Sequence, residues 1–269
     1  MSEDLKRLTA DVFDRAAPAY DAVGVPFFAP IARRLVELAA IGPGEHVLDV
    51  GTGRGAVLWE AAERVGPTGR VAATDLAPEM VRRTAADAAA RGLAHVVVTV
   101  GDAEAPEFPD ASFDAVLGGL VVFMLPDVPR ALREYRRLLR PGGRLAFTTF
   151  PPNAAEFAAI GPVIGRFMPP GGPPGQAALA DAAAIEAAVR AAGFADVEVV
   201  TESFDTAFRD AEQWWEWAWS QGQRVALERI PPAELDAVRA ELDAALAAHA
   251  RPDGSLPLRQ RVTYTVATT

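Results

Sequence analysis

The run HVLDVGTGRG, residues 46–55, constrains this chain more than any other segment, because a short apolar stretch passes directly into a glycine-rich turn. Gly51, Gly53 and Gly55 allow the backbone to turn tightly and to approach a ligand closely. The helix expected after them offers its N-terminal amide groups. With Ala56 the run also satisfies the looser G-x-G-x-x-G/A pattern, which on its own is a weak signal. The run therefore predicts a nucleotide-like ligand at the end of a first buried strand.

Three acidic residues, Asp49, Asp75 and Asp102, end three successive predicted strands. The charge of Asp49 would repel the pyrophosphate of a dinucleotide but attract the ammonium and sulfonium groups of S-adenosylmethionine. The alternative is that Asp49 only braces the turn by accepting backbone N–H groups, and both roles can coexist. An acidic residue about 20 positions after such a turn can accept both ribose hydroxyls, so Asp75 is the ribose candidate, although it could instead cap the next helix. Asp102 could accept from an adenine amino group, or act as a loop turn-former.

Residues 1–150 alternate short apolar segments with amphipathic ones. This alternation implies a parallel sheet with right-handed crossovers, a doubly wound α/β fold whose ligands bind beyond the carboxyl ends of the strands. The expected helices are 4–22, 29–41, 56–66, 77–92 and 128–143, and the expected strands are 45–50, 69–75, 94–102, 113–119 and 144–150. After a proline- and glycine-rich stretch, we expect helices at 181–194, 210–229 and 232–250, and strands at 195–208 and 261–268.

Composition and charge exclude several classes of function. The formal net charge of −10 and the pI near 4.9 disfavour nucleic acid and anionic membranes as partners. The absence of cysteine excludes disulfides, thiolate metal sites and a cysteine nucleophile. The N-terminus lacks the pattern of a secretory signal, and no apolar run reaches the roughly 18 residues that suggest a membrane span, so we expect a cytoplasmic protein without a membrane partner.

Four segments together resemble the successive motifs of class I S-adenosylmethionine-dependent methyltransferases: VLDVGTGRG, VAATDLAPEM, VTVGDAEAPEFPDASFDAVLGG and LREYRRLLRPGGRLAFTTF. The nearest group is the ubiquinone/menaquinone type, which includes many small-molecule enzymes of bacterial secondary metabolism. VFDRAAPAYD also resembles that group's N-terminal helix, which closes over the cofactor. The resemblance implies an α/β fold with a seven-stranded, mostly parallel sheet of order 3-2-1-4-5-7-6, in which strand 7 is antiparallel.

The resemblance also implies one methyltransferase domain over residues 1–269. Its parts are an N-terminal lid (1–30), a cofactor-binding core (31–150), cap segments inserted before the last strand (151–180 and 207–258) and a closing strand (259–269). It implies a cofactor site in which Asp49, Gly51, Thr52 and Gly53 approach the methionine end, Asp75 holds the ribose, Leu76 and Met80 pack the adenine, Asp102 and Ala103 read the adenine edge, Gly118, Gly119 and Leu120 lie beside the methionine, and Tyr20 acts from the lid.

Many of these relatives carry a histidine pair a few residues after strand 4. This chain has Phe123 and Met124 at those positions. The three histidines, His46, His95 and His249, lie elsewhere, so we expect no histidine base. Methyl transfer by an SN2 reaction can proceed without one, since orientation alone can supply up to about 7–11 kcal/mol and a dry site protects the reaction from water. If a base is needed, the candidates are Tyr20, Asp21, Tyr264 or a bound water.

The segment DAEQWWEWAWSQGQ contains four of the five tryptophans. On a helix, Trp214 and Trp217 share one face, and Trp215 and Trp219 share another. One face should pack on the core, and the other could line a substrate pocket. The equally supported alternative is that all four tryptophans are structural. The predicted substrate-binding residues are Phe123, Met124, Phe150, Trp214 and Trp217.

The function predicted from the sequence is S-adenosylmethionine-dependent O- or C-methylation of a hydrophobic small molecule, aromatic or polyketide-like, in bacterial secondary metabolism. The product would be S-adenosylhomocysteine, no metal is expected, and the chain would act as a monomer or homodimer. An alternative is a protein of the same fold that binds the cofactor but catalyses a cyclisation or rearrangement, because fold does not fix function. A nicotinamide-dependent oxidoreductase is the third interpretation.

Overall fold

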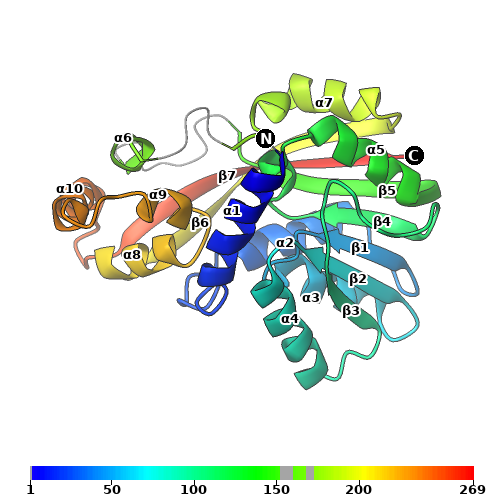
Figure 1. Ribbon diagram of the computed structural model, residues 1–269, viewed down its shortest axis with the longest axis horizontal. Coiled ribbons are helices and arrows are strands. Elements are labelled where there is room, and N and C mark those ends of the chain that lie inside the picture. Colours follow the sequence, from blue (N-terminus) through cyan, green and yellow to red (C-terminus); the bar gives the residue numbers. More distant parts are fainter. Residues whose placement is uncertain (1, 152–159, 168–172) are drawn as a thin grey trace.

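The computed structural model describes residues 2–151, 160–167 and 173–269. Within these residues, seven strands form one sheet in the order β3-β2-β1-β4-β5-β7-β6 (Figure 1). β7 runs antiparallel to both β5 and β6, and the other pairs are parallel, so the predicted sheet is confirmed. The strands are β1 His46–Val50, β2 Arg70–Asp75, β3 Val96–Val100, β4 Phe113–Gly118, β5 Leu139–Thr149, β6 Ala195–Phe208 and β7 Leu256–Thr268.

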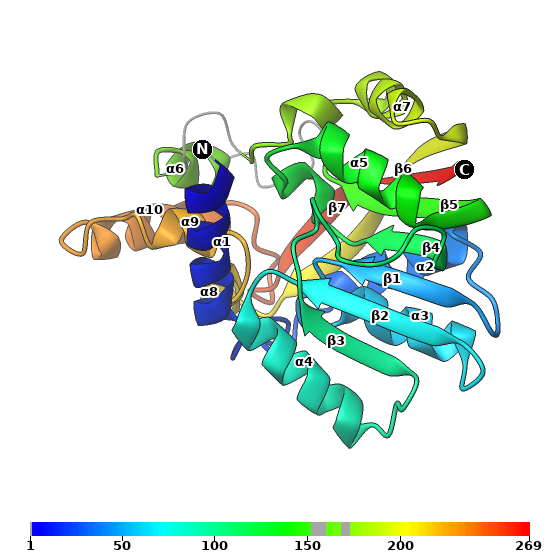
Figure 2. The ribbon, with the colours of Figure 1, turned by 45° about the vertical axis from the view of Figure 1, so that its right-hand side comes forward.

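Helices bury both faces of this sheet. α2 (Phe28–Leu38) and α3 (Ala56–Val65) pack on one face, and α5 (Val128–Leu138) and α7 (Ala182–Ala191) cover the other (Figures 1 and 2). Successive side chains of a strand point to opposite faces, so Val47 packs with α2 and α3 while Leu48 packs toward α5 and α7. With both faces covered, the carboxyl ends of the strands are the edge at which a ligand can bind.

α1 (Ser2–Ala16) crosses that carboxyl edge (Figure 2). On one side it contacts α4 (Pro78–Ala90), where the backbone amide of Glu79 donates to Asp14 at 2.7 Å. On the other side it contacts α9 (Arg224–Leu227), where Arg15 pairs with Glu228 at 2.5 Å. α1 therefore bridges the sheet and the C-terminal helices, as a lid segment would.

The β6–β7 hairpin extends beyond β5, because residues 256–262 of β7 pair only with β6. α6 (Ile160–Gly165), α8 (Ala211–Trp219), α9 and α10 (Leu235–Ala247) gather at this end of the molecule (Figures 1 and 2). Two short 3₁₀ helices lie at Val122–Met124 and Ala177–Leu179. Parts of the expected cap segment 151–180, namely residues 152–159 and 168–172, lie outside the described residues.

Several expected boundaries were wrong where proline or glycine interrupts a helical pattern. The helix expected at 4–22 ends at Ala16, because Ala17 precedes Pro18 and a residue before proline disfavours the helical conformation. The helix expected at 128–143 ends at Leu138, and β5 begins at the next residue, since Pro141 and the left-handed Gly142 cannot continue a helix. The helix expected at 210–229 divides into α8 and α9 around Gly222.

Two further elements at the C-terminal end also differ from the prediction. The helix expected at 232–250 covers only Leu235–Ala247. The closing strand begins at Leu256, well before the expected start, because its first half pairs with the far end of β6, with Phe208 opposite Leu256. The longer hairpin carries the C-terminal helices away from the sheet centre.

Candidate active site

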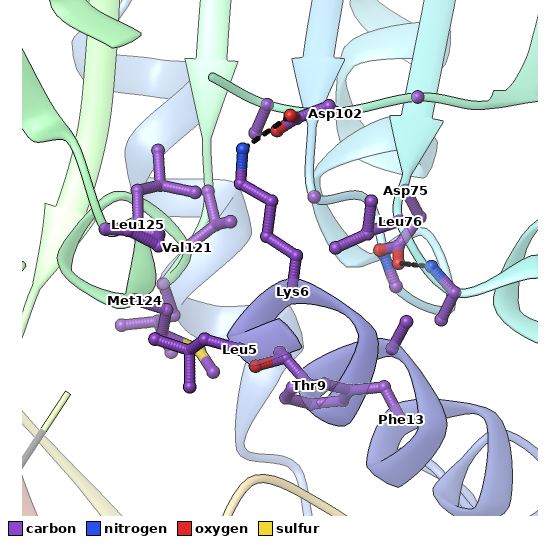
Figure 3. Close-up of a pocket in the computed structure, with 18 of the residues that line it drawn as sticks. Leu5, Lys6, Thr9, Phe13, Asp75, Leu76, Asp102, Val121, Met124 and Leu125 are labelled. Carbon is purple, nitrogen blue, oxygen red and sulfur yellow. Dashed lines mark hydrogen bonds and ion pairs between the residues drawn. The ribbon is translucent and has the colours of Figure 1, made fainter. Parts of the chain in front are cut away.

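A cavity lies between α1 and the carboxyl ends of the strands, and we call it the α1 cavity. Figure 3 shows side chains from both walls pointing into it. One wall is a stripe of α1 that includes Leu5, Thr9 and Phe13, which follow one another at helical spacing. The opposite wall consists of residues at the ends of, or just after, β1, β2, β3 and β4. The cavity therefore lies where a doubly wound fold binds its ligand.

The glycine turn is shaped by close packing and by one carboxylate. Gly51 has a φ of +63°, and a Cβ built on it would lie 2.4 Å from Val121 Cγ2. No other residue type fits there without a shift. Asp75 Oδ2 accepts a hydrogen bond of 2.7 Å from the Gly53 amide, and its Oδ1 accepts one of 2.9 Å from the Ala77 amide. Asp75 thus holds the turn and also lines the α1 cavity.

Asp49 lies beneath the turn, at 1% exposure, and is not a lining residue of the α1 cavity. Its Oδ2 accepts a hydrogen bond of 2.7 Å from the Thr52 hydroxyl. Its Oδ1 is buried with no hydrogen-bond partner among the described residues. Burial raises the pKa of Asp49 to about 7, and the negative charge of Asp75 adds to the effect. Asp49 therefore braces the turn through Oδ2, while its buried Oδ1 accepts no hydrogen bond from the described residues.

A charged cluster that the sequence analysis missed lies at the opposite end of the cavity. Lys6 Nζ is 2.7 Å from Asp102 Oδ2 and 2.5 Å from Glu104 Oε2. Burial alone would lower the pKa of Lys6, but its hydrogen bonds and ion pairs with the two carboxylates outweigh this and raise it. Lys6 therefore stays charged at neutral pH, and it joins α1 to the loop after β3.

Tyr20 lies beside the glycine turn, where a Cβ built on Gly53 would be 3.6 Å from its ring. Its ring stacks on Phe28 at a centroid distance of 5.0 Å. Burial, together with the charges of Asp75 and Asp21, raises the pKa of Tyr20 well above its ordinary value. The phenol is therefore protonated at neutral pH and is suited to donate a hydrogen bond rather than to accept a proton.

The other candidate bases do not line the cavity. Tyr264 packs in the core, where burial and the charge of Glu202 raise its pKa to about 12. Asp21 follows the lining residue Tyr20, with a left-handed φ of 56°, and is itself outside the lining. Burial raises the pKa of Asp21 to about 6. His46 and His95 lie at the amino-terminal ends of β1 and β3. Among the residues that the structure describes, no histidine lines the α1 cavity.

The predicted substrate residues are divided between the cavity and the core. Met124 lines the α1 cavity, whereas Phe123 is 7% exposed and packs edge-on against Phe150. Trp214 and Trp217 are buried in the core, where Trp217 contacts Phe27 and Phe208 at centroid distances of 5.0 and 5.3 Å. Within the described part of the chain, no tryptophan lines the α1 cavity, so neither face of α8 reaches it.

Most residues predicted to bind the cofactor line the α1 cavity. These are Tyr20, Gly51, Gly53, Asp75, Leu76, Asp102, Ala103, Gly119 and Leu120. The others, Asp49, Thr52, Met80 and Gly118, lie outside the lining. Sequence reasoning missed Leu5, Lys6, Thr9, Ala10, Phe13, Ala77, Gly101, Val121, Leu125 and Pro126. The α1 residues among them share one face at spacings of three and four, but spacing does not indicate which face of the helix meets the cavity.

The fold and this cavity define a class of protein. A family model described as a methyltransferase domain matches residues 47–143. Together with the high identity to a curated methyltransferase along most of the chain, this match shows that the chain belongs to the class I S-adenosylmethionine-dependent methyltransferases. The resemblance seen in the sequence is therefore confirmed, and a nicotinamide-dependent oxidoreductase is not supported.

Among curated proteins, the chain is similar to the nocamycin O-methyltransferase of Saccharothrix syringae, with 45% identity over 254 residues, 89% of this chain and 91% of that protein. It is 43% identical over 164 residues to the aklanonic acid methyltransferase DauC of Streptomyces sp. (strain C5), which covers 61% of this chain and 74% of DauC. Among solved structures, the YcgJ protein of Bacillus subtilis aligns over 89% of this chain and 98% of its own, with a TM-score of 0.62 and 19% identity, a likeness in fold alone.

The residues of the α1 cavity fit the cofactor that the family implies. The carboxylates of Asp75 and Asp102 line this cavity, with apolar Leu76 and Ala103 beside them. Beneath the glycine turn, outside the lining, the unpartnered Asp49 Oδ1 is an acceptor that suits an ammonium group. In the described ranges, no group of three or more His, Asp or Glu residues is arranged to hold a metal ion. No helix in those ranges is both long and apolar enough to cross a membrane.

Proposed function

We propose that the α1 cavity binds S-adenosylmethionine along the carboxyl edge of the sheet. The methionine end would lie at Gly51, Gly53, Gly119 and Leu120, with its ammonium near Asp49. The ribose would lie at Asp75, and the adenine between Leu76 and Ala103 with its amino group on Asp102. Support comes from the convergence of these residues on one cavity, and the lid, core and cap divisions of the chain are part of the same proposal.

We further infer that the acceptor is an oxygen that is already ionised at neutral pH, and a carboxylate in the first place. The observation that carries this inference is the lining as described: the phenol of Tyr20 has a raised pKa, Lys6 is held charged by two carboxylates, and the carboxylates of Asp75 and Asp102 are assigned to the nucleoside. A general base is most effective when its pKa lies near the working pH. An ionised acceptor removes the need for one.

The names of two relatives point in the same direction. The nocamycin enzyme is an O-methyltransferase, and the second relative acts on aklanonic acid, which is an acid by name. We therefore propose O-methylation of a hydrophobic, polyketide-like acid in secondary metabolism.

One wall of the α1 cavity suits such a substrate. Leu5, Val121, Met124 and Leu125 lie together on one side in Figure 3 and offer an apolar surface. Burial of apolar substrate area against them contributes roughly 25 cal/mol per Å² and excludes water from the reacting atoms. Lys6, the one cation of the described lining, is already paired with two acids.

The bound cofactor supplies an electrophilic methyl group, and the residues of this chain supply orientation and a dry environment. Asp75 and Asp102 would fix the nucleoside by hydrogen bonds, and the unpartnered oxygen of Asp49 would fix the ammonium. α1 lines one wall of the site and would keep water from a bound acceptor. Alignment of the acceptor oxygen with the methyl group can supply several kcal/mol of the barrier reduction, up to about 7–11.

A panel of polyketide-derived acids, with matched phenols and alcohols as controls, tests this proposal with S-adenosylmethionine that carries a labelled methyl group. The acids should be labelled, and mild alkali should release the label as volatile methanol, because it hydrolyses methyl esters. Label that resists alkali would show an ether, N-methyl or C-methyl product and contradict a carboxylate acceptor. A product of unchanged mass would instead favour the cyclisation or rearrangement alternative.

A further inference from the structure

Lys6 spans the α1 cavity from α1 to the loop after β3. Figure 3 shows its side chain rising between Leu76 on one side and Val121 on the other to reach Asp102. The residue is 8% exposed although it belongs to a helix at the molecular surface. It is also the only lysine of the chain. A long cationic side chain is costly to bury unless it is paired, so its position is set by its partners.

The two partners of Lys6 differ in what else they can do. Glu104 is 1% exposed, and its Oε1 accepts a hydrogen bond from the Asp127 amide, so it belongs to the core. The Asp102 side chain is 30% exposed and lines the α1 cavity. Asp102 Oδ1 accepts from the Glu104 amide at 2.9 Å, and Oδ2 is the atom that Lys6 contacts.

An adenine amino group that donates to Oδ2 would have to occupy the part of the α1 cavity that the Lys6 side chain fills, because Lys6 lines this cavity and its Nζ lies 2.7 Å from Oδ2. We propose that cofactor binding displaces Lys6 from Asp102, and that Lys6 then holds α1 over the cofactor through Glu104 alone. This inference rests on the proposed position of the adenine. Lys6 is a positioning residue in this account, because it acts through α1 and is not in contact with the reacting atoms.

The proposal predicts that Lys6 slows both the entry and the escape of the cofactor. Entry is slowed because the ion pair with Asp102 must first break. Escape is slowed because the pair with Glu104, which is largely removed from water, must break before α1 can lift. Hydrogen bonds to charged groups contribute about 1.5–3 kcal/mol each, which corresponds to rate changes of roughly tenfold or more.

Stopped-flow fluorescence with S-adenosylhomocysteine as the probe measures both rate constants. Lys6→Met should raise the association and the dissociation rate constants about tenfold each, with a smaller change in Kd. Glu104→Gln should raise the dissociation rate constant in the same way. The matched control is Arg7→Met, because Arg7 is the neighbouring cation of α1 but pairs with Asp4 in solvent. Unchanged rate constants in Lys6→Met would overturn the proposal.

A second measurement uses the wild-type chain and so avoids any defect in folding. Because Lys6 is the only lysine, an amine-reactive acetylating reagent can modify only this side chain and the α-amino group. S-adenosylhomocysteine should slow acetylation of Lys6 about tenfold and leave the α-amino group unchanged. Equal or faster acetylation of Lys6 with the ligand would overturn the proposal. Failure of the wild type to bind the probe at all would instead overturn the proposed cofactor site, and this inference with it.

Discussion

The carboxylate of Asp75 lies 2.7 Å from the backbone nitrogen of Gly53, so the residue that ends β2 shapes the turn that follows β1. Its second oxygen accepts from the Ala77 amide at the start of α4. One side chain therefore fixes two backbone segments and still faces the α1 cavity. The helix-capping and the ligand-binding interpretations of Asp75 are compatible, because each oxygen has more than one lone pair.

Asp75→Asn should weaken both the fold and cofactor binding. An asparagine presents one oxygen and one NH₂ group, so one of the two amide donors would lose its acceptor, at a cost of about 1–3 kcal/mol. We expect the affinity for S-adenosylhomocysteine to fall at least about tenfold by calorimetry, and the free energy of unfolding to fall in urea. Asp110→Asn is the control, because Asp110 is a surface residue whose side chain is 77% exposed. Unaltered affinity in Asp75→Asn would contradict the role at the ribose.

Asp49→Asn should stabilise the fold at neutral pH. The pKa of Asp49 is raised by burial from 3.8 to about 7, so between these values the unfolded chain releases a proton that the folded chain keeps. Stability from this group is therefore greatest below pH 4, falls as the pH rises to about 7, and is then constant. At about 1.4 kcal/mol per pKa unit, the advantage of Asp49→Asn should grow to a few kcal/mol by pH 7.

Urea unfolding of both proteins at pH 4 and pH 8 measures this difference. The same variant should bind S-adenosylhomocysteine about tenfold more weakly, because the charge that would meet the ammonium group is lost. A stability difference that is the same at both pH values would show that Asp49 titrates near its ordinary pKa in the folded chain. Tight binding by Asp49→Asn would show that the carboxylate only braces the turn.

Tyr20→Phe should leave most of the activity in place. A general base contributes about 10²–10⁴-fold to a rate, and its loss would be evident. Because the raised pKa keeps Tyr20 protonated, we expect the variant to lose no more than about tenfold in kcat, which corresponds to one hydrogen bond. Steady-state kinetics with an identified acid substrate checks this expectation. A loss of several hundredfold would identify Tyr20 as a catalytic residue.

Trp217→Ala should destabilise the protein before it affects any substrate. Trp217 is 5% exposed and packs between Phe27 and Phe208, and truncation of a buried aromatic side chain costs about 3–5 kcal/mol. Trp219→Ala is the control, since Trp219 is only partly buried and its loss should cost less. Denaturant unfolding measures both variants. Trp217→Phe keeps most of the core volume filled. A large rise in the KM of this variant for the acceptor substrate would support the substrate-binding role predicted from the sequence.

The strand order was predictable from the family resemblance. The positions of the first strands were predictable because β1, β2 and β3 are short apolar runs that an acidic residue ends or follows. Asp75 and Asp102 lie on the same edge for this reason. The contact between Lys6 and Glu104 was not predictable, because it depends on how α1 is rotated about its own axis. Although α1 is amphipathic, the apolar Leu8 is 59% exposed and the charged Lys6 is 8% exposed.

The tryptophan segment shows a second limit of the sequence pattern. Helical spacing indicates which side chains share a face, but it does not indicate what that face meets. Trp214 and Trp217 share a face as predicted, and that face meets Phe27 and Phe208 in the core. α8 follows β6 directly, so its position depends on how far the β6–β7 hairpin extends.

The most direct test of the central claim is a crystal structure of the complex with S-adenosylhomocysteine. Our account predicts the nucleoside in the α1 cavity, with the adenine amino group on Asp102 Oδ2 and the ribose hydroxyls within hydrogen-bond distance of Asp75. The sulfur atom should lie beside Gly119 and Leu120 and face Met124. A ligand bound elsewhere, or in this cavity with its adenine away from Asp102, would contradict the account.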